Sequence, residues 1–388
     1  MTEIAFTESE ERRALRREVA KLASTYGREY FVSQARSGGR TTDLWLAIGK
    51  NGYLGINIPE EYGGGGGGIG DIAAVCEELA AQGCPLLMMV VSPAICGTVI
   101  SRFGTEQQKQ RWLPGIADGT ETMAFAITEP DAGTNSHNIS TTARRDGDGW
   151  VLNGRKIYIS GVDEAANVLV VARTEDAKTG KLKPCLFVVP TDAEGFEYTP
   201  IPMEIVSPEQ QFGVFIDDVK LPADALVGDE DAGLIQLFAG LNPERIMAAS
   251  FSTGLARYAL DKAVAYVKER EVFGAPIGTH QGLAHPLAQS KIEIELARLM
   301  TQKAAALYDA GDDMGAGEAA NMAKYAAAEA ACDAADRAVQ AHGGNGITQE
   351  YGVAGLLVAA RAGRIAPVSR EMILNFVGMH SLGLPKSY

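Results

Sequence analysis

The sequence predicts a mixed α and β protein of several domains, in which a β domain stands between two helical regions. Its 388 residues exceed what a single hydrophobic core usually supports. Apolar residues recur at helical spacing over roughly the first 120 residues and again after Gly233, whereas the middle consists of short Val-, Ile-, Phe- and Tyr-rich runs between Gly, Asp, Asn and Pro. We therefore predict a helical N-terminal domain over residues 1–122, a β-barrel over 123–229 and a four-helix bundle over 230–388.

The N-terminal region begins with a strong helix signal. Residues 7–10 (Thr-Glu-Ser-Glu) offer a capping side chain and first-turn carboxylates, and residues 11–27 carry apolar side chains at helical spacing. A second helix is expected around Leu44 and Ile48, and two buried helices are expected over 71–103. The glycine run 63–68 must be a loop, and the sequence leaves open whether it is a flexible surface connection or a functional segment.

The middle region reads as strands and turns. Residues 150–152 and 155–159 flank Asn153 and Gly154, the pair typical of a type I′ turn, so we predict a β-hairpin with its turn at these two residues. Further strands are predicted at 168–173, 185–189 and 214–216.

The C-terminal region contains three long amphipathic patterns, at 255–268, 288–308 and 318–340. Only a few turn residues interrupt them. Antiparallel helices of this length are typical of a four-helix bundle.

Composition and charge narrow the possible partners. The net charge of −14 repels nucleic acid and anionic membranes at long range, so a phosphate-bearing ligand needs locally placed Arg, Lys or backbone N–H groups. The five cysteines show no paired spacing and the histidines no metal-ligand spacing, which favours reduced thiols and no metal site. No apolar run reaches the ~20 residues of a membrane span, and the N-terminal residues lack a secretory pattern. We therefore expect a cytoplasmic protein.

Individual motifs are ambiguous when each is taken alone. The run Gly343-Gly344-Asn345-Gly346 either approaches a phosphate or ends a helix as a C-cap. Glu244 is either a base or a solvated charge near a helix start.

Together, the motifs resemble the acyl-CoA dehydrogenase family over nearly the whole chain. The matching tracts, in the order that the family shows, are 52–53 with 59–64, 124–135, 154–160, 244–245, 270–276, 280–281 and 340–346. This resemblance implies an FAD enzyme that desaturates the acyl chain of a coenzyme A thioester.

The resemblance also implies roles for individual residues. Those implied to bind FAD are Phe125, Ile127, Thr128, Gly133, Thr134, Tyr158, Ser160, Arg270, Phe273, Gln281, Gln340, Gly343, Gly344 and Ser369. Those implied to contact substrate are Thr134, Asn242 and Arg245. Arg245 either faces the coenzyme A end of the substrate or orders the base, with a buried ion pair as the structural alternative. In the family, some FAD contacts cross a subunit interface, so we expect a homotetramer or dimer.

The catalytic base departs from the common family pattern. Most members carry a Glu near the C-terminus, where this sequence has Pro367. A minority, similar to isovaleryl-CoA and long-chain acyl-CoA dehydrogenases, carry the base directly before an arginine in the C-terminal domain. Glu244 before Arg245 matches that position, so we predict Glu244 as the base and rank Glu371 second.

Two prolines raise further questions. In the family, a backbone N–H at the position of Pro367 polarises the thioester carbonyl together with a ribityl hydroxyl of FAD, and proline has no N–H. Either Ala366 or Val368 supplies the donor, or another group does. Pro243 is expected to kink or restart the helix just before Glu244.

Three hypotheses follow from the resemblance and the departures from it. The first is an active dehydrogenase of fatty acid metabolism that passes electrons to an electron-transfer flavoprotein. The second is a catalytically silent subunit that binds FAD or coenzyme A and pairs with an active chain, which the loss at Pro367 motivates. The third is a flavin oxidase or monooxygenase on the same scaffold.

Overall fold

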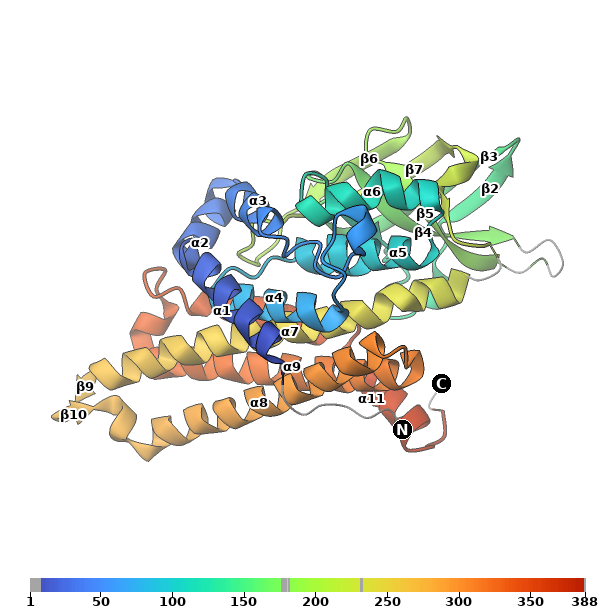
Figure 1. Cartoon of the computed structure of the whole chain (residues 1–388). Coiled ribbons are helices and arrows are strands. Elements are labelled where there is room, and N and C mark those ends of the chain that lie inside the picture. The colour runs from blue at the N-terminus through green and yellow to red at the C-terminus, as the bar shows by residue number, and fades with distance from the viewer. Residues whose placement is uncertain (1–7, 176–179, 181, 231–232, 387–388) are drawn as a thin grey trace.

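The computed structural model describes residues 8–175, 180, 182–230 and 233–386. Helices of the N-terminal region lie above a long helical bundle, and a β region projects from one end of the molecule (Figure 1). The predicted order of helices, strands and helices is therefore confirmed, and the fold is mixed α and β. No described helix is long and apolar enough to cross a membrane.

The N-terminal region is helical as predicted. Its first helix starts after Ser9, whose hydroxyl accepts a hydrogen bond from the Arg12 amide. Its elements are α1 (Glu10–Ser24), α2 (Gly27–Ser37), α3 (Thr42–Lys50), η1 (Glu60–Tyr62), α4 (Ile69–Ala81), the π-helix η2 (Val90–Gly97), α5 (Thr98–Phe103) and α6 (Glu106–Asp118).

The glycine run is a loop, as predicted, and lies largely exposed at the surface while its backbone amides bond the chain that precedes it. The Gly66 and Gly67 amides donate to the carbonyls of Ile58 and Ile56. A Cβ on Gly64 would lie 2.0 Å from the Ile58 carbonyl oxygen, which explains why glycine is required there. The run thus folds back on residues 55–60 and leads directly into α4.

The β region forms one eight-stranded sheet in the order β6-β7-β3-β2-β4-β5-β8, with β1 pairing with β4. The end strands β6 and β8 do not pair with each other within the described residues. The strands are β1 (Met123–Ala126), β2 (Thr142–Asp146), β3 (Gly149–Ser160), β4 (Asn167–Glu175), β5 (Leu182–Pro190), β6 (Phe196–Ile201), β7 (Gln211–Leu221) and β8 (Leu226–Val227).

The predicted hairpin turn at Asn153 and Gly154 is wrong, because β3 runs straight through both residues. The Asn153 side chain exchanges hydrogen bonds with Asp218 on β7, and the pairing of β3 with β7 shifts register at this point. A Cβ on Gly154 would lie 2.3 Å from the Thr141 hydroxyl, so the glycine permits a close approach of backbone and not a turn. The real hairpin turn joins β2 to β3 over residues 146–149.

The C-terminal region is a bundle of long helices, as predicted. Pro243 lies inside α7, so the predicted restart of the helix there is wrong. The elements are α7 (Gly233–Glu269), β9 (Glu271–Val272), β10 (Ala275–Pro276), η5 (Ile277–Thr279), α8 (Gln281–Asp309), α9 (Asp313–His342), η6 (Gly343–Ile347), α10 (Ala354–Ile365), α11 (Arg370–Phe376) and η7 (Val377–Ser381).

A buried cluster of charges joins the N-terminal helices to the bundle. Arg16 of α1 bonds Glu77 and Glu78 of α4, both at 2.8 Å. Arg257 of α7 reaches the same two carboxylates, and Arg298 of α8 reaches Glu77 at 3.1 Å. Glu8, 2.7 Å from Arg16, adds a third carboxylate. Because three arginines then face three carboxylates, α4 is held between α1, α7 and α8 without an orphaned charge.

Candidate active site

The segment after β1 is held against strand β3. The Ile157 amide donates to the Thr128 carbonyl at 2.9 Å, and the Lys156 ammonium donates to the Ile127 carbonyl at 3.1 Å. Phe125 on β1 is buried, whereas Ile127 and Thr128 are partly buried. Residues 125–128, which are implied to line the flavin, are thus brought beside strand β3, which carries Tyr158 and Ser160.

A buried ion pair that the sequence analysis missed fixes this arrangement. The Lys156 Nζ lies 2.9 Å from a Glu129 carboxylate oxygen, and both side chains are almost fully buried. Burial alone would raise the pKa of Glu129, but Lys156 and hydrogen bonds from Ser140 and Thr141 outweigh it and lower that pKa. A lysine on the same face of β3 as Trp150 and Leu152 was the available signal, since such a side chain needs a buried partner.

The remaining residues implied to line the flavin present accessible groups. Tyr158 has a left-handed φ of 58° and is 56% exposed, although Tyr is uncommon in that conformation. The Ser160 hydroxyl pairs with the Gln211 amide, while Gly133 and Thr134 are exposed. Within the described residues, the hydroxyls of Thr128 and Thr134 have no hydrogen-bond partner, so both are free to bind a ligand.

Glu244 lies inside α7, partly buried, and not at a helix start as the alternative reading held. Burial raises the pKa of Glu244 to about 7, while the positive charges of Arg245 and Lys324 oppose this rise. Across from it, Cys96 of η2 is buried close enough for the Glu244 charge to raise the pKa of its thiol further. No described residue hydrogen-bonds the Glu244 carboxylate, which leaves it free to take a proton.

Arg245 does not form the buried ion pair that was its alternative role. Its Nη1 donates to the Leu241 carbonyl and to Asn242 Oδ1, each at 3.3 Å, and no described residue forms an ion pair with it. Its Nε is buried without a partner. Asn242 is buried and donates to the Asp313 carbonyl, so it orients Arg245 from one side.

The segment between α10 and α11 carries Pro367. The Ala366 amide donates to the Ala362 carbonyl at 2.9 Å and so ends α10. The Val368 amide has no acceptor in the described part of the chain. The Val368 carbonyl accepts from Lys324 at 2.5 Å, and the Ser369 hydroxyl caps α11 by accepting from the Met372 amide.

A second set of predicted residues lies at the far end of the bundle. Arg270 and Phe273 belong to the β9–β10 hairpin, Gln281 begins α8, and Gln340 and Gly343 end α9. The hairpin and the β region lie at opposite ends of the molecule (Figure 1). Phe273 is 95% exposed, and the exposed Arg270 has no ion pair among the described residues.

Gly343 forms the helix C-cap that was one of the two roles the sequence left open. Gly343 caps α9 by donating to the Gln340 carbonyl, which confirms the C-cap. Its φ is 58°, and nothing lies within 4 Å of a Cβ built on Gly343 or on Gly344. A phosphate can therefore approach this backbone closely.

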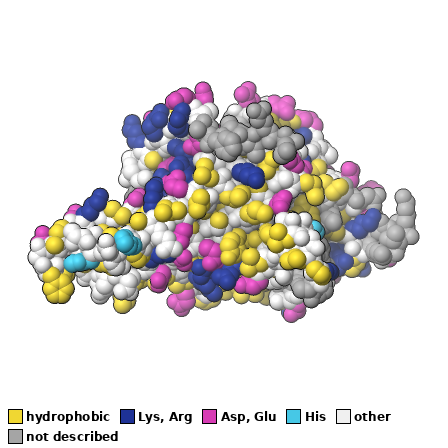
Figure 2. Space-filling model, turned by 90° about the horizontal axis from the view of Figure 1, so that it is seen from below, with side chains coloured by type: hydrophobic (Ala, Val, Ile, Leu, Met, Phe, Trp, Pro, Cys, Tyr) yellow, Lys and Arg dark blue, Asp and Glu magenta, His cyan; other side chains and the backbone are white. Residues whose placement is uncertain are grey.

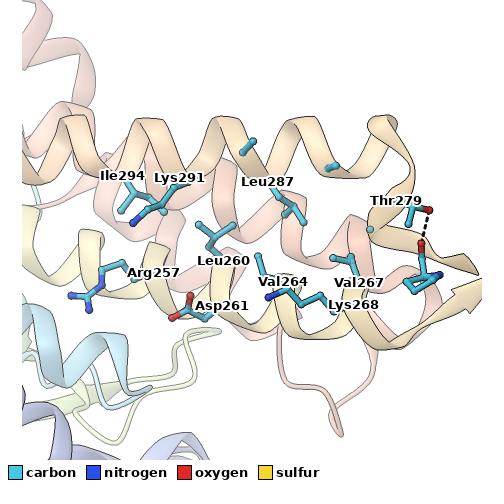
Figure 3. Close-up of a pocket in the computed structure, with 14 residues that line it drawn as sticks. Arg257, Leu260, Asp261, Val264, Val267, Lys268, Thr279, Leu287, Lys291 and Ile294 are labelled. Atoms are coloured by element: carbon cyan, nitrogen blue, oxygen red, sulfur yellow. Dashed lines mark hydrogen bonds between the residues drawn. The ribbon is translucent and has the colours of Figure 1, made fainter.

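A cavity of about 750 Å³ lies between α7 and α8, apart from these residues. Aliphatic side chains such as Leu260, Val264 and Leu287 point into it, with Lys268 and Lys291 at its rim (Figure 3). Leu260 is ~24 Å along α7 from Glu244, because a helix rises 1.5 Å per residue. The cavity contains none of the groups predicted for chemistry.

Comparison with known proteins decides the family. Models of the N-terminal, middle and C-terminal domains of acyl-CoA dehydrogenases match residues 9–120, 124–213 and 231–382. The chain is 66% identical to the acyl-CoA dehydrogenase FadE12 of Mycobacterium tuberculosis over 388 residues, all of both chains. The chain belongs to the acyl-CoA dehydrogenase family.

Solved acyl-CoA dehydrogenases share the fold described above. A glutaryl-coenzyme A dehydrogenase in complex with glutaryl-CoA superposes with a TM-score of 0.94 at 30% identity, covering 99% of this chain and 98% of the other. The glutaryl-CoA dehydrogenase of Mycobacterium smegmatis, solved with FADH2, gives a TM-score of 0.89 at 28% identity, covering 98% and 96%. This acyl-CoA dehydrogenase is therefore an FAD-dependent enzyme that oxidises acyl-CoA thioesters, as the sequence predicted.

The residues present fit FAD. The free hydroxyls of Thr128 and Thr134 suit the polar edge of a flavin ring, and the unpaired Arg270 suits a pyrophosphate. The exposed Phe273 offers an aromatic face, and Gly343 and Gly344 leave open space for close backbone contact. The described residues contain no group of side chains that could hold a metal ion.

Proposed function

We propose that Glu244 is the catalytic base of this acyl-CoA dehydrogenase. The observation that supports it most is the partly buried carboxylate of Glu244, free of hydrogen-bond partners among the described residues, with a pKa raised to about 7. A base needs its proton affinity near the operating pH, and an ordinary solvated Glu is too weak. Glu371 is exposed, so the same argument does not apply to it.

In the proposed reaction, Glu244 removes the proton from the carbon alpha to the thioester. When bound, FAD accepts the hydride from the beta carbon. Arg245 and Asn242 orient the thioester end of the substrate, because the buried Arg245 Nε has no other partner. The Val368 amide is the N–H of the 366–368 segment that remains free to polarise the thioester carbonyl, since the Ala366 amide ends α10.

The test is the bleaching of the visible flavin band by acyl-CoA thioesters in the absence of oxygen. We expect the flavin band of wild type and of Glu371→Gln to bleach with at least one member of a chain-length series of acyl-CoA thioesters. In Glu244→Gln, the rate of bleaching should fall by a factor of at least about 10² at unchanged FAD content. Retained bleaching in Glu244→Gln would refute the assignment.

We further propose that two copies of the chain share each FAD. The isoalloxazine side is assigned to Phe125, Ile127, Thr128, Gly133, Thr134, Tyr158, Ser160 and Ser369, and the adenosine pyrophosphate side to Arg270, Phe273, Gln281, Gln340, Gly343 and Gly344. Glu244 and the hairpin are separated by ~38 Å of α7, and the β region lies beyond, so one FAD does not reach both sets within one chain.

Exposed apolar side chains also favour a homodimer or homotetramer. Ile292, Leu296 and Leu299 follow one another at helical spacing on α8, and each is more than half exposed. Figure 2 shows hydrophobic side chains over much of the face seen from below. We expect light scattering to give a dimer or tetramer, and Phe273→Ala to lower FAD content without unfolding the chain. A monomer that retains stoichiometric FAD would contradict this.

The anaerobic assay also separates the other hypotheses. Absence of bound flavin in the purified chain would favour the silent subunit, and rapid peroxide formation in air would favour an oxidase or monooxygenase. We propose an electron-transfer flavoprotein as the electron acceptor, and a cytoplasmic role in fatty acid metabolism. Reoxidation of the reduced enzyme by a purified electron-transfer flavoprotein, faster than by oxygen, would support this.

A further inference from the structure

Lys324 is an almost fully buried cation near the base. It lies on α9, which packs along α7, and only 1% of the residue is exposed. Its ammonium donates to the Val368 carbonyl at 2.5 Å, and no ion pair is formed by it in the described part of the chain. Burying a charge without a counterion is costly, so such a lysine is retained only where something requires it.

Charged groups from three helices face this lysine. The charges that influence its pKa are those of Glu244 and Arg245 on α7, Glu329 on α9 itself and Glu371 on α11. Burial and the charge of Arg245 together lower the pKa of Lys324 to about 8, although the three carboxylates oppose this fall. Lys324 is therefore still largely an ammonium at neutral pH.

The position of its hydrogen bond connects Lys324 to the unusual proline. Val368 directly follows Pro367, and its carbonyl is fixed by Lys324 on one side while Ser369 starts α11 on the other. The same ammonium therefore touches the backbone of the 366–369 segment and acts electrostatically on Glu244.

We propose that Lys324 is a positioning residue of the reaction, whose ammonium keeps Glu244 ionised and holds the 366–369 segment in place beside it. This inference rests on the proposed role of Glu244 as base. Arg245 is the larger of the two positive charges that oppose the raised pKa of Glu244, and Lys324 adds to it. Without Lys324, Glu244 takes up a proton at higher pH and fewer molecules are competent at neutral pH.

The test isolates proton removal from hydride transfer. In a 3-thia-acyl-CoA, sulfur replaces the beta carbon, so the alpha proton can leave while no beta hydride exists. With FAD bound, the resulting enolate would give a long-wavelength charge-transfer band, and the pH titration of that band would report the proton affinity of the base. 3-Thia-octanoyl-CoA and 3-thia-butyryl-CoA are the probes, with the FAD-loaded enzyme.

We expect Lys324→Met to move the titration midpoint upward by about one pH unit, because an opposite charge nearby favours the ionised carboxylate. Lys324→Gln provides a second neutral replacement that retains hydrogen-bonding capacity, should the Met variant lose FAD. Lys324→Arg should restore a midpoint close to wild type. Lys303→Gln, an exposed lysine on α8, is the matched control and should leave it unchanged.

Two failures can be told apart. A wild-type midpoint in the neutral variants that retain FAD would overturn the role of Lys324, provided that Glu244→Gln abolishes the band. A charge-transfer band that persists in Glu244→Gln would overturn the assignment of the base, and the role of Lys324 with it. A midpoint shifted equally in Lys324→Arg and Lys324→Met would also overturn the electrostatic role, because arginine keeps the charge.

Discussion

Removing the Lys156 ammonium should destabilise the β region and weaken FAD binding at the proposed flavin site. In Lys156→Met, the Glu129 carboxylate loses its counterion but keeps four hydrogen bonds from the amides and hydroxyls of Ser140 and Thr141. Breaking a buried pair by removing one partner costs about 3–5 kcal/mol, and the surviving hydrogen bonds place this case at the lower end, about 3 kcal/mol. The bond from Lys156 to the Ile127 carbonyl is lost as well, so FAD affinity should fall.

The sign of the pH dependence follows from the lowered pKa of Glu129. A carboxyl whose pKa is lower in the folded than in the unfolded protein stabilises the fold above the unfolded pKa, and this contribution disappears as the pH falls through the folded pKa. The difference between wild type and Lys156→Met should therefore be full at pH 7 and shrink in acid.

Urea unfolding followed by tryptophan fluorescence measures this difference. Arg145→Met is the matched control, since Arg145 pairs with Glu230 at the surface of the same sheet and should change stability by no more than about 1 kcal/mol. In the double variant Lys156→Met/Glu129→Gln, the loss in unfolding free energy should be clearly smaller than the sum of the losses in the two single variants. Equal effects of Lys156→Met and Arg145→Met, or strict additivity in the cycle, would refute the reasoning.

Three further predictions concern other parts of the fold. Gly64→Ala should cost about 1–3 kcal/mol in urea unfolding, because the new Cβ meets the Ile58 carbonyl oxygen, whereas Gly282→Ala, with open space around it, should be nearly neutral; equal losses would contradict the packing argument. Asp309→Ala should cost about 1–2 kcal/mol, since its carboxylate accepts from two amides at the start of α4, and an unchanged unfolding midpoint would be the contrary result. Burial raises the pKa of Glu164 to about 7, so the folded state binds a proton that the unfolded state has lost between the two pKa values; Glu164→Gln should therefore stabilise the enzyme on the order of 2 kcal/mol at pH 8 but little at pH 4, and thermal melts showing the same gain at both would refute this.

Periodicity predicted the larger elements because they bury a continuous apolar stripe. The long helices of the bundle and the strands around 168–173 and 185–189 appear where the sequence placed them. The prediction of a hairpin at Asn153 was wrong because turn propensity is a local signal. Here the side-chain bonds to Asp218 and the close approach of Thr141 to Gly154 keep β3 extended. Tertiary contacts therefore overrode a favourable dipeptide.

Candidate site residues could be predicted from the sequence only where they belong to a recognisable motif. Glu244, Arg245 and the segment from Phe125 to Thr134 stand in recognisable tracts. Lys156 and Lys324 were missed because their partners, Glu129 and Val368, lie 27 and 44 residues away, and only folding brings them together. A buried lysine is visible in sequence as a charge at an apolar position, but its partner is not.

Pro367 removes both the usual glutamate and the backbone N–H expected at this position, and the two losses can be explained together. If Glu244 of α7 is the base, as proposed, the side chain at position 367 has no proton to move, and proline is tolerated there. The backbone at this position would still have to polarise the thioester, and that need falls on the next amide, Val368, which is uncommitted among the described residues. Fixing the Val368 carbonyl through Lys324 limits the movement of the peptide chain around that amide. In the proposed mechanism, a lysine that both steadies this backbone and supports the charge of Glu244 would therefore link the proposed base to the segment that contains Pro367.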